Sequence, residues 1–447
     1  MIVVIGAGPA GLAAADALVR SGCKVTILDA ASRPGGQYWR NQGAVSGYKS
    51  ARSGRYFGQL AANPAVTYIS GAAVWSAENK QGSYTINFLR ADKEESIVAE
   101  KIILATGAFD RTLPFPGWDM PGVMTAGGAQ ALLKGHGVLA GKKIVIAGTG
   151  PFLFPVATGL AAAGAQIVGI FEAHSPLRWL RSLPAIFRNP SKIIELVHYM
   201  KLMSSLGIRT HFGSAVISAN LGSVTVSRVD RLLKVKVGSE KSFDCDVVAV
   251  GWGFTPDLSL AGILSCAQRV DSDGTVVVKV DSFQQSSVPN IWVAGEATGI
   301  GGADLALIEG EIAGLSAAGK KIPQRLMRKK SAQQSFARAL QRSYPIPIGW
   351  QSWLTGETLI CRCEEVSLDA ITSSVVDLGA QDSRTVKLFT RAGMGLCQGR
   401  ICSQNVSEIV GNFRGCAVSD QERIAGSNRP IASPITLGQL GDGIESD

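Results

Sequence analysis

The chain has 447 residues, of which 46% are hydrophobic and 52 are glycine, enough sequence for two α/β domains and a small appendage. No apolar run reaches the roughly 20 residues of a membrane-spanning helix, because glycines and charges interrupt each one. The net charge of +9 comes with only 7% aromatic residues and no nucleic-acid-binding motif, so we exclude nucleic-acid binding and expect a solvated surface or an acidic partner.

The first predicted element is a short buried strand over residues 2–5, followed by a glycine-rich turn and an alanine-rich helix. The turn has the pattern G-x-G-x-x-G, whose glycines make the turn, admit a pyrophosphate and let helix and strand pack. A second strand, residues 24–28, ends at an acid that can bind ribose hydroxyls. An ordinary βα turn is the alternative. The predicted cofactor contacts are Gly6, Gly8, Pro9, Ala10, Gly11, Asp29 and Ala30.

Two further N-terminal segments carry candidate contacts. Residues 34–39, Pro-Gly-Gly-Gln-Tyr-Trp, include an amide that could tune a flavin ring by hydrogen bonding or could simply satisfy a turn. Residues 101–107 predict another buried strand that closes on a glycine. Strand ends that converge on one crevice suit a dinucleotide as long as FAD. The predicted contacts are Gly36, Gln37, Val74, Ala105, Thr106 and Gly107.

A second dinucleotide-binding fold is predicted from Lys142, with strands over residues 144–147 and 166–171. Its third glycine position holds Leu153, whose bulk should push the helix away from the strand or obstruct a pyrophosphate. Nucleotide binding therefore stays open here, with NAD, ADP and ATP as candidates. The acid at the second strand end would favour a free 2′-hydroxyl. The candidate residues are Gly148, Gly150, Pro151 and Glu172.

A further strand, residues 288–294, ends at Gly295 and Glu296, and a helix is predicted from about Ala303. This arrangement would put the Glu296 carboxylate beside the ribityl chain of FAD and aim the helix N-terminus at the flavin pyrimidine. The alternative is that Glu296 only caps the helix. A polar helical pattern over residues 324–343 follows.

Four of the eight cysteines form two close pairs near the C-terminal end, as C-x-C and C-x4-C. The other four are scattered and no signal peptide precedes the glycine-rich turn, so we expect a metal centre in a cytoplasmic protein rather than disulfides. A C-x-C pair is too short for a comfortable zinc knuckle, which favours a [2Fe-2S] cluster, with structural zinc as the alternative. The proposed ligands are Cys361, Cys363, Cys397 and Cys402.

Residues 1–320 resemble the two-dinucleotide-fold flavoprotein disulfide reductase superfamily, through the turn at residues 6–11 and the strand ends at Gly107 and Glu296. The resemblance implies FAD as the cofactor and a dinucleotide domain inserted between those two strand ends. Glu296 replaces the usual aspartate of the superfamily. The superfamily's redox Cys-x-x-Cys pair is missing from the sequence, so disulfide reductase activity is not expected.

Residues from about 359 to 416 resemble the [2Fe-2S] domain of bacterioferritin-associated ferredoxin, which implies that the four paired cysteines bind iron. Together with residues 34–39 and 391–395, this layout resembles the A or α subunits of opine oxidases (octopine and nopaline dehydrogenases). Hydroxyproline dehydrogenase α, proline dehydrogenase α and the B component of hydrogen cyanide synthase share it. The resemblance implies an oxidoreductase complex acting on CH-NH donors. A D-amino-acid-oxidase-like flavoprotein β subunit would oxidise the substrate, beside a small third subunit and an external electron acceptor.

The predicted fold class is α/β, with two Rossmann-like three-layer dinucleotide-binding domains and a small C-terminal α-rich [2Fe-2S] domain. The predicted boundaries are residues 1–118 and 245–320 for the FAD-binding domain, 119–244 for the inserted domain, 321–356 for a linker, 357–418 for the [2Fe-2S] domain and 419–447 for an extended tail.

No acid–base constellation is recognised around the four histidines, so no catalytic residue is assigned and the chain is expected to transfer electrons for its complex. Two alternatives stay open. One is a self-contained NADH-dependent flavin and iron–sulfur reductase, and the other is a nucleotide-binding scaffold subunit whose cluster is architectural.

Overall fold

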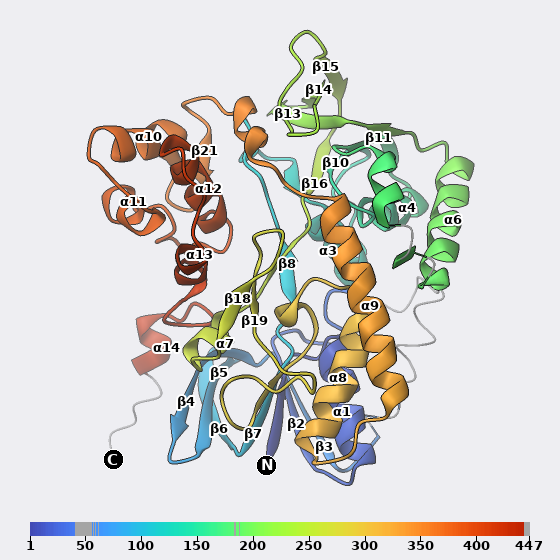
Figure 1. The fold of residues 1–447 in the computed structure, drawn as a ribbon, viewed down its shortest axis with the longest axis vertical. Coiled ribbons are helices and arrows are strands. Elements are labelled where there is room, and N and C mark those ends of the chain that lie inside the picture. Colours follow the sequence, from blue (N-terminus) through green and yellow to red (C-terminus); the bar gives the residue numbers. More distant parts are fainter. Residues whose placement is uncertain are drawn as a thin grey trace. The chain divides into compact units, whose positions relative to one another are not determined.

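The structure is a computed structural model that describes residues 1–40, 56, 58, 60, 62–182, 185, 186 and 188–441 (Figure 1). The chain forms two compact units. Unit 1 comprises Met1–Ala108, Thr255–Ala337 and Ser427–Asp447, and unit 2 comprises Phe109–Phe254 and Arg338–Gly426. The domain boundaries expected from the sequence stay a prediction.

Unit 1 is built on a five-stranded sheet in the order β20-β7-β1-β2-β3, in which all neighbouring strands are parallel. In the central pair, Ile2 lies opposite Val25. The strands are rich in valine and isoleucine on both faces, as a parallel sheet covered on both sides requires. Their bounds are β1 (Ile2–Ile5), β2 (Val25–Asp29), β3 (Val66–Ser70), β7 (Lys101–Leu104) and β20 (Ile291–Val293).

Two different layers cover this sheet. Val4 belongs to a buried core with residues of the two helices, whereas Val3 belongs to a core with residues of an antiparallel sheet. The helices approach closely, since a Cβ at Gly310 would lie 2.0 Å from the Ala10 carbonyl oxygen. The covering elements are α1 (Pro9–Arg20), α8 (Ala303–Ala317), β4 (Ala73–Lys80), β5 (Ser83–Arg90) and β6 (Lys93–Ala99).

The remaining elements of unit 1 lie mostly after residue 254. The helical pattern expected over residues 324–343 is present as α9. The backbone N–H of Ala432 donates to the Trp75 carbonyl oxygen over 2.7 Å, which ties the chain end to β4. These elements are α7 (Ser259–Ile263), β18 (Gln268–Val270), β19 (Val276–Val278), η2 (Gly295–Thr298) and α14 (Leu437–Gly441). Three elements cross the boundaries with unit 2, namely α9 (Gln324–Ser343), β8 (Ala108–Asp110) and β17 (Phe254–Pro256).

The tail expected to be extended instead contains two short helices, α13 (Asp420–Ser427) and α14. Side-chain caps account for both. Ser419 Oγ accepts a hydrogen bond from the Glu422 amide over 3.1 Å, and Thr436 Oγ1 accepts one from the Gln439 amide over 3.2 Å. Residues 442–447 lie outside the described part of the chain.

Unit 2 contains a second parallel sheet, in the order β12-β11-β10-β16-β9. A three-stranded antiparallel sheet, β13-β14-β15, comes between β12 and β16 along the chain. This strand–helix–strand succession is the predicted second dinucleotide-binding fold. Its elements are β9 (Val123–Thr125), α3 (Ala126–His136), β10 (Lys143–Gly148), α4 (Leu153–Ala162), β11 (Gln166–Glu172), η1 (Pro176–Ser182), α6 (Pro190–Ser205), β12 (Thr210–Phe212), β13 (Ser214–Asn220), β14 (Ser223–Arg228), β15 (Lys241–Asp244) and β16 (Val247–Gly251).

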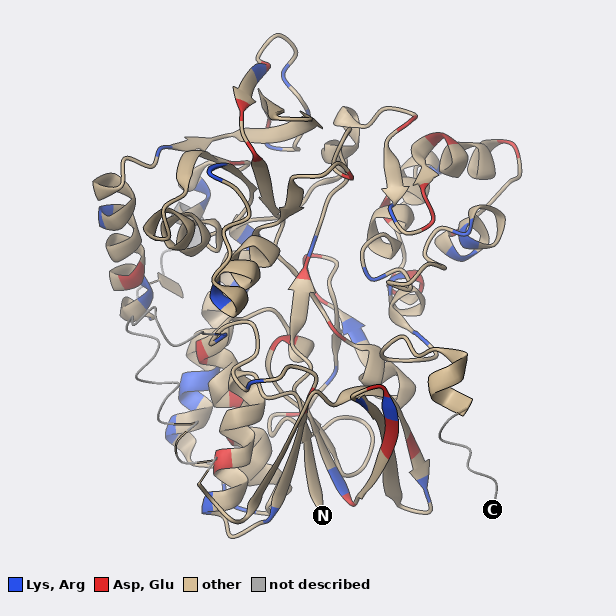
Figure 2. Ribbon diagram, turned by 180° about the vertical axis from the view of Figure 1, so that it is seen from behind, with Lys and Arg blue, Asp and Glu red and all other residues tan. Residues whose placement is uncertain are grey.

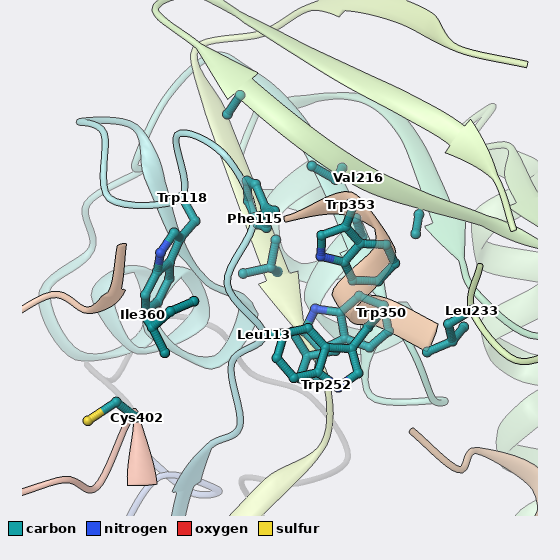
Figure 3. Close-up of a cluster of buried hydrophobic side chains, with 14 of the residues drawn as sticks. Leu113, Phe115, Trp118, Val216, Leu233, Trp252, Trp350, Trp353, Ile360 and Cys402 are labelled. Carbon is teal, nitrogen blue, oxygen red and sulfur yellow. The ribbon is translucent and has the colours of Figure 1, made fainter. Parts of the chain in front are cut away.

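The cysteine-rich segment folds into small helices that share a core with this second fold. Figure 3 shows Trp118, Trp252, Trp350 and Trp353 in one buried cluster, and the sulfur of Cys402 lies near Ile360 at its edge. The cluster therefore joins the sheet to the cysteine-bearing elements. These are η3 (Ile348–Trp353), β21 (Leu359–Cys361), β22 (Val366–Ser367), α10 (Leu368–Val376), α11 (Ser383–Thr390) and α12 (Ser403–Phe413).

Candidate functional site

The glycine turn between β1 and α1 is shaped as a phosphate cradle. Gly6 has φ +101°, and a Cβ there would lie 2.3 Å from the Ala105 carbonyl oxygen. A Cβ at Gly11 would lie 1.8 Å from the Gly6 carbonyl oxygen. At Gly8, in contrast, a Cβ would meet nothing within 4 Å, and this residue is the N-cap of α1. The turn is thus closed by two glycines and open at the third, where the helix amides could meet a pyrophosphate.

Asp29 lies at the end of β2 and is tied to this turn. Its carboxylate accepts hydrogen bonds from the Ala7 amide and from the Ala31 amide, the latter over 2.7 Å. Burial raises its pKa, against the effect of those two donors. The acid therefore fixes the glycine turn at the edge where an adenosine ribose is expected. Ala30 beside it is exposed.

The segment after Asp29 folds back onto the same turn. The Gly35 amide donates to the Ala7 carbonyl oxygen over 2.8 Å. Gly36 has φ +56°, and a Cβ there would lie 2.9 Å from the Gly8 Cα. Gln37 is exposed at this loop. Val74 is buried in β4 and paired with Phe88, and the chain just before β4 is joined to the end of β2, because the Ala72 amide donates to the Asp29 carbonyl oxygen over 2.9 Å.

The ends of β7 and β20, the two other strands predicted to contact the cofactor, lie next to the glycine turn between β1 and α1. The Ala294 amide donates to the Leu104 carbonyl oxygen over 3.0 Å, which aligns the ends of β20 and β7. Thr106 Oγ1 donates to the Asp257 carbonyl oxygen over 2.7 Å. Gly295 has φ +81°, and a Cβ there would lie 2.9 Å from the Ala10 Cβ. Unit 1 therefore brings the segments around Gly8, Thr106 and Gly295 to one edge of its sheet.

Glu296 binds backbone amides ahead of α8. Its two oxygens accept from the Gly301 amide over 3.1 Å and from the Gly302 amide over 2.9 Å. Burial raises its pKa to about 7. Both amides precede the first helical residue and α8 has no side-chain cap hydrogen bond, so Glu296 holds the loop that leads into α8, at the sheet edge where a ribityl chain is expected. The assignment of Glu296 to FAD stays a prediction.

Two buried residues of unit 1 were not recognised from the sequence. Glu309 of α8 accepts from the Gly295 amide over 3.1 Å and from Thr298 Oγ1 over 2.9 Å, so it holds the turn η2. Lys330 of α9 donates to the Ser282 carbonyl oxygen over 3.1 Å. A charged residue among the alanines and leucines of residues 303–317 was the available signal for Glu309.

In the second dinucleotide-binding fold, the acidic residue at the end of β11, Glu172, is hydrogen-bonded to the glycine turn after β10. Glu172 accepts from Thr149 Oγ1 and from the Gly150 amide, each over 2.8 Å, and from the His174 amide over 3.0 Å. A Cβ at Gly148 would lie 1.9 Å from the Gly251 carbonyl oxygen, whereas Gly150 faces open space. A ribose would therefore compete with the turn for Glu172. Whether this fold binds a nucleotide stays a prediction, as does a contact from Pro151.

Leu153 does not push the helix away from the sheet, contrary to expectation. It is fully buried in the core beneath α4. Room is available because Gly251 has no side chain, since a Cβ there would lie 3.1 Å from Leu153 Cδ2. The Leu153 side chain thus packs in the space that the missing side chain of Gly251 leaves on β16.

Burial raises the pKa of Glu172 to about 7 from an ordinary 4.5. The folded state therefore binds more protons than the unfolded state between these values, and this contribution to stability is complete below pH 4.5 and lost as pH rises through about 7. We expect the difference in unfolding free energy between wild type and Glu172→Gln to fall over this window and to level above it. Urea unfolding across pH measures this, with the exposed Glu240→Gln as control. A difference that rises with pH would contradict the assignment.

The four paired cysteines come together in unit 2. Cys361 and Cys402 are each 1% exposed, Cys397 is half-buried and Cys363 is exposed. The Cys361 thiol is hydrogen-bonded to Cys402, and the Cys363 thiol to Cys397. In the described residues no three ligand side chains converge on the position of a single metal ion. Each hydrogen-bonded pair joins one cysteine of C-x-C to one of C-x4-C, and Cys402 interacts with all three others, so the four thiols face one centre, as the four thiolate ligands of a [2Fe-2S] cluster require.

Backbone amides and glycines support these thiols. The Gly393 amide donates to Cys361 Sγ over 3.4 Å. The hydrogen bond from Cys402, outweighing burial and helped by backbone amides, lowers the pKa of Cys361 to about 5. A Cβ at Gly395 would lie 2.3 Å from the Cys363 Cβ, so only glycine fits there. The donor set and its amides fit a negatively charged iron–sulfur cluster.

The helix that follows Cys402 is anchored to the second fold. Arg111 forms an ion pair with Glu408 of α12 over 3.0 Å, and both side chains are largely buried. Trp350 Nε1 donates to the same carboxylate over 3.3 Å. Trp118 Nε1 donates to the Leu359 carbonyl oxygen over 2.6 Å, just before Cys361. These contacts fix both ends of the cysteine centre within unit 2.

Basic and acidic residues are interspersed along the coloured part of the ribbon in Figure 2. Next to the cysteines, Arg391 pairs with Glu364 over 2.8 Å, and the Arg362 guanidinium lies 5.1 Å from the Trp118 ring centre. These arginines are thus held by local partners. No described helix is both long enough and apolar enough to cross a membrane.

Comparisons with known proteins agree with this geometry. Residues 1–325 match the family described as pyridine nucleotide-disulphide oxidoreductase, and residues 359–412 match the BFD-like [2Fe-2S] binding domain. The chain is 32% identical over 419 residues to the HcnB subunit of hydrogen cyanide synthase from Pseudomonas aeruginosa, covering 90% of each chain. It is 31% identical over 465 residues to the A subunit of opine oxidase from Rhizobium meliloti, covering 99% of this chain and 98% of the relative.

A solved structure shows the same fold. L-Proline dehydrogenase from P. horikoshii has a TM-score of 0.70 and 21% identity, and the match covers 98% of this chain and 78% of that one. The predicted fold class, the resemblance to opine oxidase A subunits, and FAD and [2Fe-2S] as cofactors are confirmed.

Proposed function

This chain belongs to the pyridine nucleotide-disulphide oxidoreductase family, and from that premise we propose that it is the electron-transfer subunit of a multi-subunit dehydrogenase that oxidises an opine, imino acid or amino acid. Opines of the octopine and nopaline type are the favoured substrates. A partner flavoprotein subunit, resembling a D-amino-acid oxidase, carries out the oxidation. The relatives of this chain by sequence are named as subunits of opine oxidase and of hydrogen cyanide synthase, which supports the proposal that the chain works in a complex.

One observation carries this proposal: a single chain holds both a dinucleotide cradle with a flavoprotein strand arrangement and a four-thiol centre. When bound, FAD exchanges electron pairs and a [2Fe-2S] cluster exchanges single electrons. The turn from Gly6 to Gly11 would hold the pyrophosphate of FAD, and Asp29 its ribose. A reducing compartment such as the cytoplasm suits a centre that needs four free thiols.

The self-contained NADH-dependent reductase is the weaker alternative. The acid that would hold the NADH ribose is buried and already accepts three hydrogen bonds from its own turn and strand end. A ribose would have to share this carboxylate with three donors, whereas Asp29 of the first fold accepts from two.

The test compares the isolated chain with the complex that forms when its partner subunits are co-expressed. Anaerobic addition of octopine, nopaline or proline should bleach flavin absorbance in the complex and leave the isolated chain oxidised, because substrate is oxidised on the partner. Stoichiometric NADH should also leave the isolated chain oxidised. Rapid reduction of the isolated chain by an opine would contradict the division of labour, and rapid reduction by NADH would favour the alternative.

A further inference from the structure

Unit 1 contains a polar cavity that the proposed electron-transfer function does not use. Its volume is about 300 Å³, within the size of small-ligand sites. It is bordered by α8, by α9 and by the segment around β19. Its lining includes Arg269, Val278, Thr298, Glu309, Lys330 and Gln334.

Two of these side chains carry opposite charges and are almost fully buried. Glu309 is 2% exposed and Lys330 is 6% exposed. Each acts electrostatically on the other, and the Asp281 carboxylate of the same lining also acts on Lys330, but the charged atoms of Glu309 and Lys330 do not come within the 4.0 Å of an ion pair. Burial raises the pKa of Glu309 and lowers that of Lys330. The two charges face the same cavity without neutralising each other directly.

Both groups keep hydrogen-bonding capacity. The Lys330 ammonium has three N–H donors and gives two of them, to the Ser282 carbonyl oxygen and to Gln284 Oε1. The Glu309 Oε2 accepts from the Gly295 amide and Thr298 Oγ1, whereas its Oε1 meets only Gln334 Nε2, over 3.5 Å. Buried charges are normally paired or ligated because their desolvation is costly. A bound group that carries both charges would complete the site.

We infer that this cavity binds a small zwitterion of the α-amino-acid class, with its carboxylate on Lys330 and its ammonium on Glu309. A simple anion would satisfy only the lysine, and a simple cation only the glutamate. Because Glu309 also holds the Gly295 amide and Thr298, an occupant would act on the turn η2 at the flavin edge. The site is thus an effector site, distinct from the partner subunit that oxidises the substrate.

The experiment uses the FAD-loaded full chain and five probes. Glycine, L-alanine and L-proline carry both charges, and acetate and ethylammonium carry one each. The zwitterions should raise the thermal midpoint saturably and change flavin fluorescence, and the single-charge probes at equal concentration should not. Lys330→Met should weaken zwitterion binding at least about tenfold, because it removes a charge-assisted hydrogen bond. The neighbouring exposed Lys329→Met is the matched control.

A second variant keeps the test valid should Lys330→Met unfold. Met327 also lines the cavity, so Met327→Trp should fill it and abolish binding while both charges remain. The inference is overturned by three results: no zwitterion binds, acetate binds as well as alanine, or Met327→Trp binds like wild type. Lys330 would then only pin α9 to residues 282–284. Because no turnover is measured, these outcomes are independent of the proposed electron transfer.

Discussion

Replacing Cys363 by serine should leave the purified chain flavin-yellow and folded but reduce its iron content from about two atoms per chain to nearly none. The exposed Cys363 pairs with Cys397, so the substitution removes one of the two thiolates expected for one iron. A serine hydroxyl is far less acidic than a thiol and a much weaker ligand for the iron of such a cluster. The FAD cradle belongs to unit 1 and should keep its flavin. Iron, zinc and sulfide analysis with visible absorbance measures the effect.

Cys416 provides the matched control for this substitution. It is also an exposed cysteine of the same segment, but it lies beyond α12 and outside the two thiol pairs. Cys416→Ser should retain full iron and the cluster absorbance. If Cys363→Ser also retained two irons, or if the wild-type chain held zinc instead, the ligand assignment would be wrong.

Gly8→Val should produce a folded chain that holds its cluster but has lost FAD. A Cβ at Gly8 meets nothing within 4 Å, and the backbone there is extended, with φ −73° and ψ −176°, so the apo fold tolerates the side chain. The added methyl groups would occupy the space through which the pyrophosphate reaches the α1 amides. Losing about two charged hydrogen bonds of about 1.5 kcal/mol each weakens FAD binding roughly a hundredfold.

Gly159→Val is the control, because a Cβ at this α4 glycine also meets nothing within 4 Å. Its flavin content should match that of wild type. Gly11→Ala is the contrasting case, since its Cβ would collide with the Gly6 carbonyl oxygen and should destabilise the fold itself. The measurement is flavin released per chain after gel filtration. Stoichiometric flavin in Gly8→Val would show that the pyrophosphate lies elsewhere.

The strands, glycine turns and helices of the two dinucleotide-binding folds could be predicted from the sequence because they follow from patterns of neighbouring residues. The strand at residues 2–5, the glycine turn and Asp29 are close in sequence, and their spacing reflects one βαβ unit. The polar helix expected over residues 324–343 is α9 because its pattern is also local. The four ligand thiols could be recognised because they come as the local patterns C-x-C and C-x4-C, although the structure pairs each thiol of one pattern with a thiol of the other.

The features that sequence reasoning missed depend on contacts distant in the chain. Leu153 is accommodated by Gly251, almost 100 residues later, which no local pattern announces. The burial of Glu309 and Lys330 arises only when α8 and α9 pack around one cavity. The shared core of Trp118 and Trp350 likewise joins one residue predicted to lie in the FAD-binding domain to one predicted to lie in the linker. Tertiary packing decided each of these cases.

The account is tested most directly by adding an opine to the anaerobic complex and recording the electron paramagnetic resonance signal of the reduced cluster. The wild-type complex should show this signal within the time of one turnover, together with bleaching of flavin. The complex carrying Cys363→Ser should bleach its partner flavin without the signal and should lose dye-coupled turnover. Full dye-coupled turnover in that variant, or a wild-type cluster that stays oxidised with substrate, would contradict the proposed electron-transfer role.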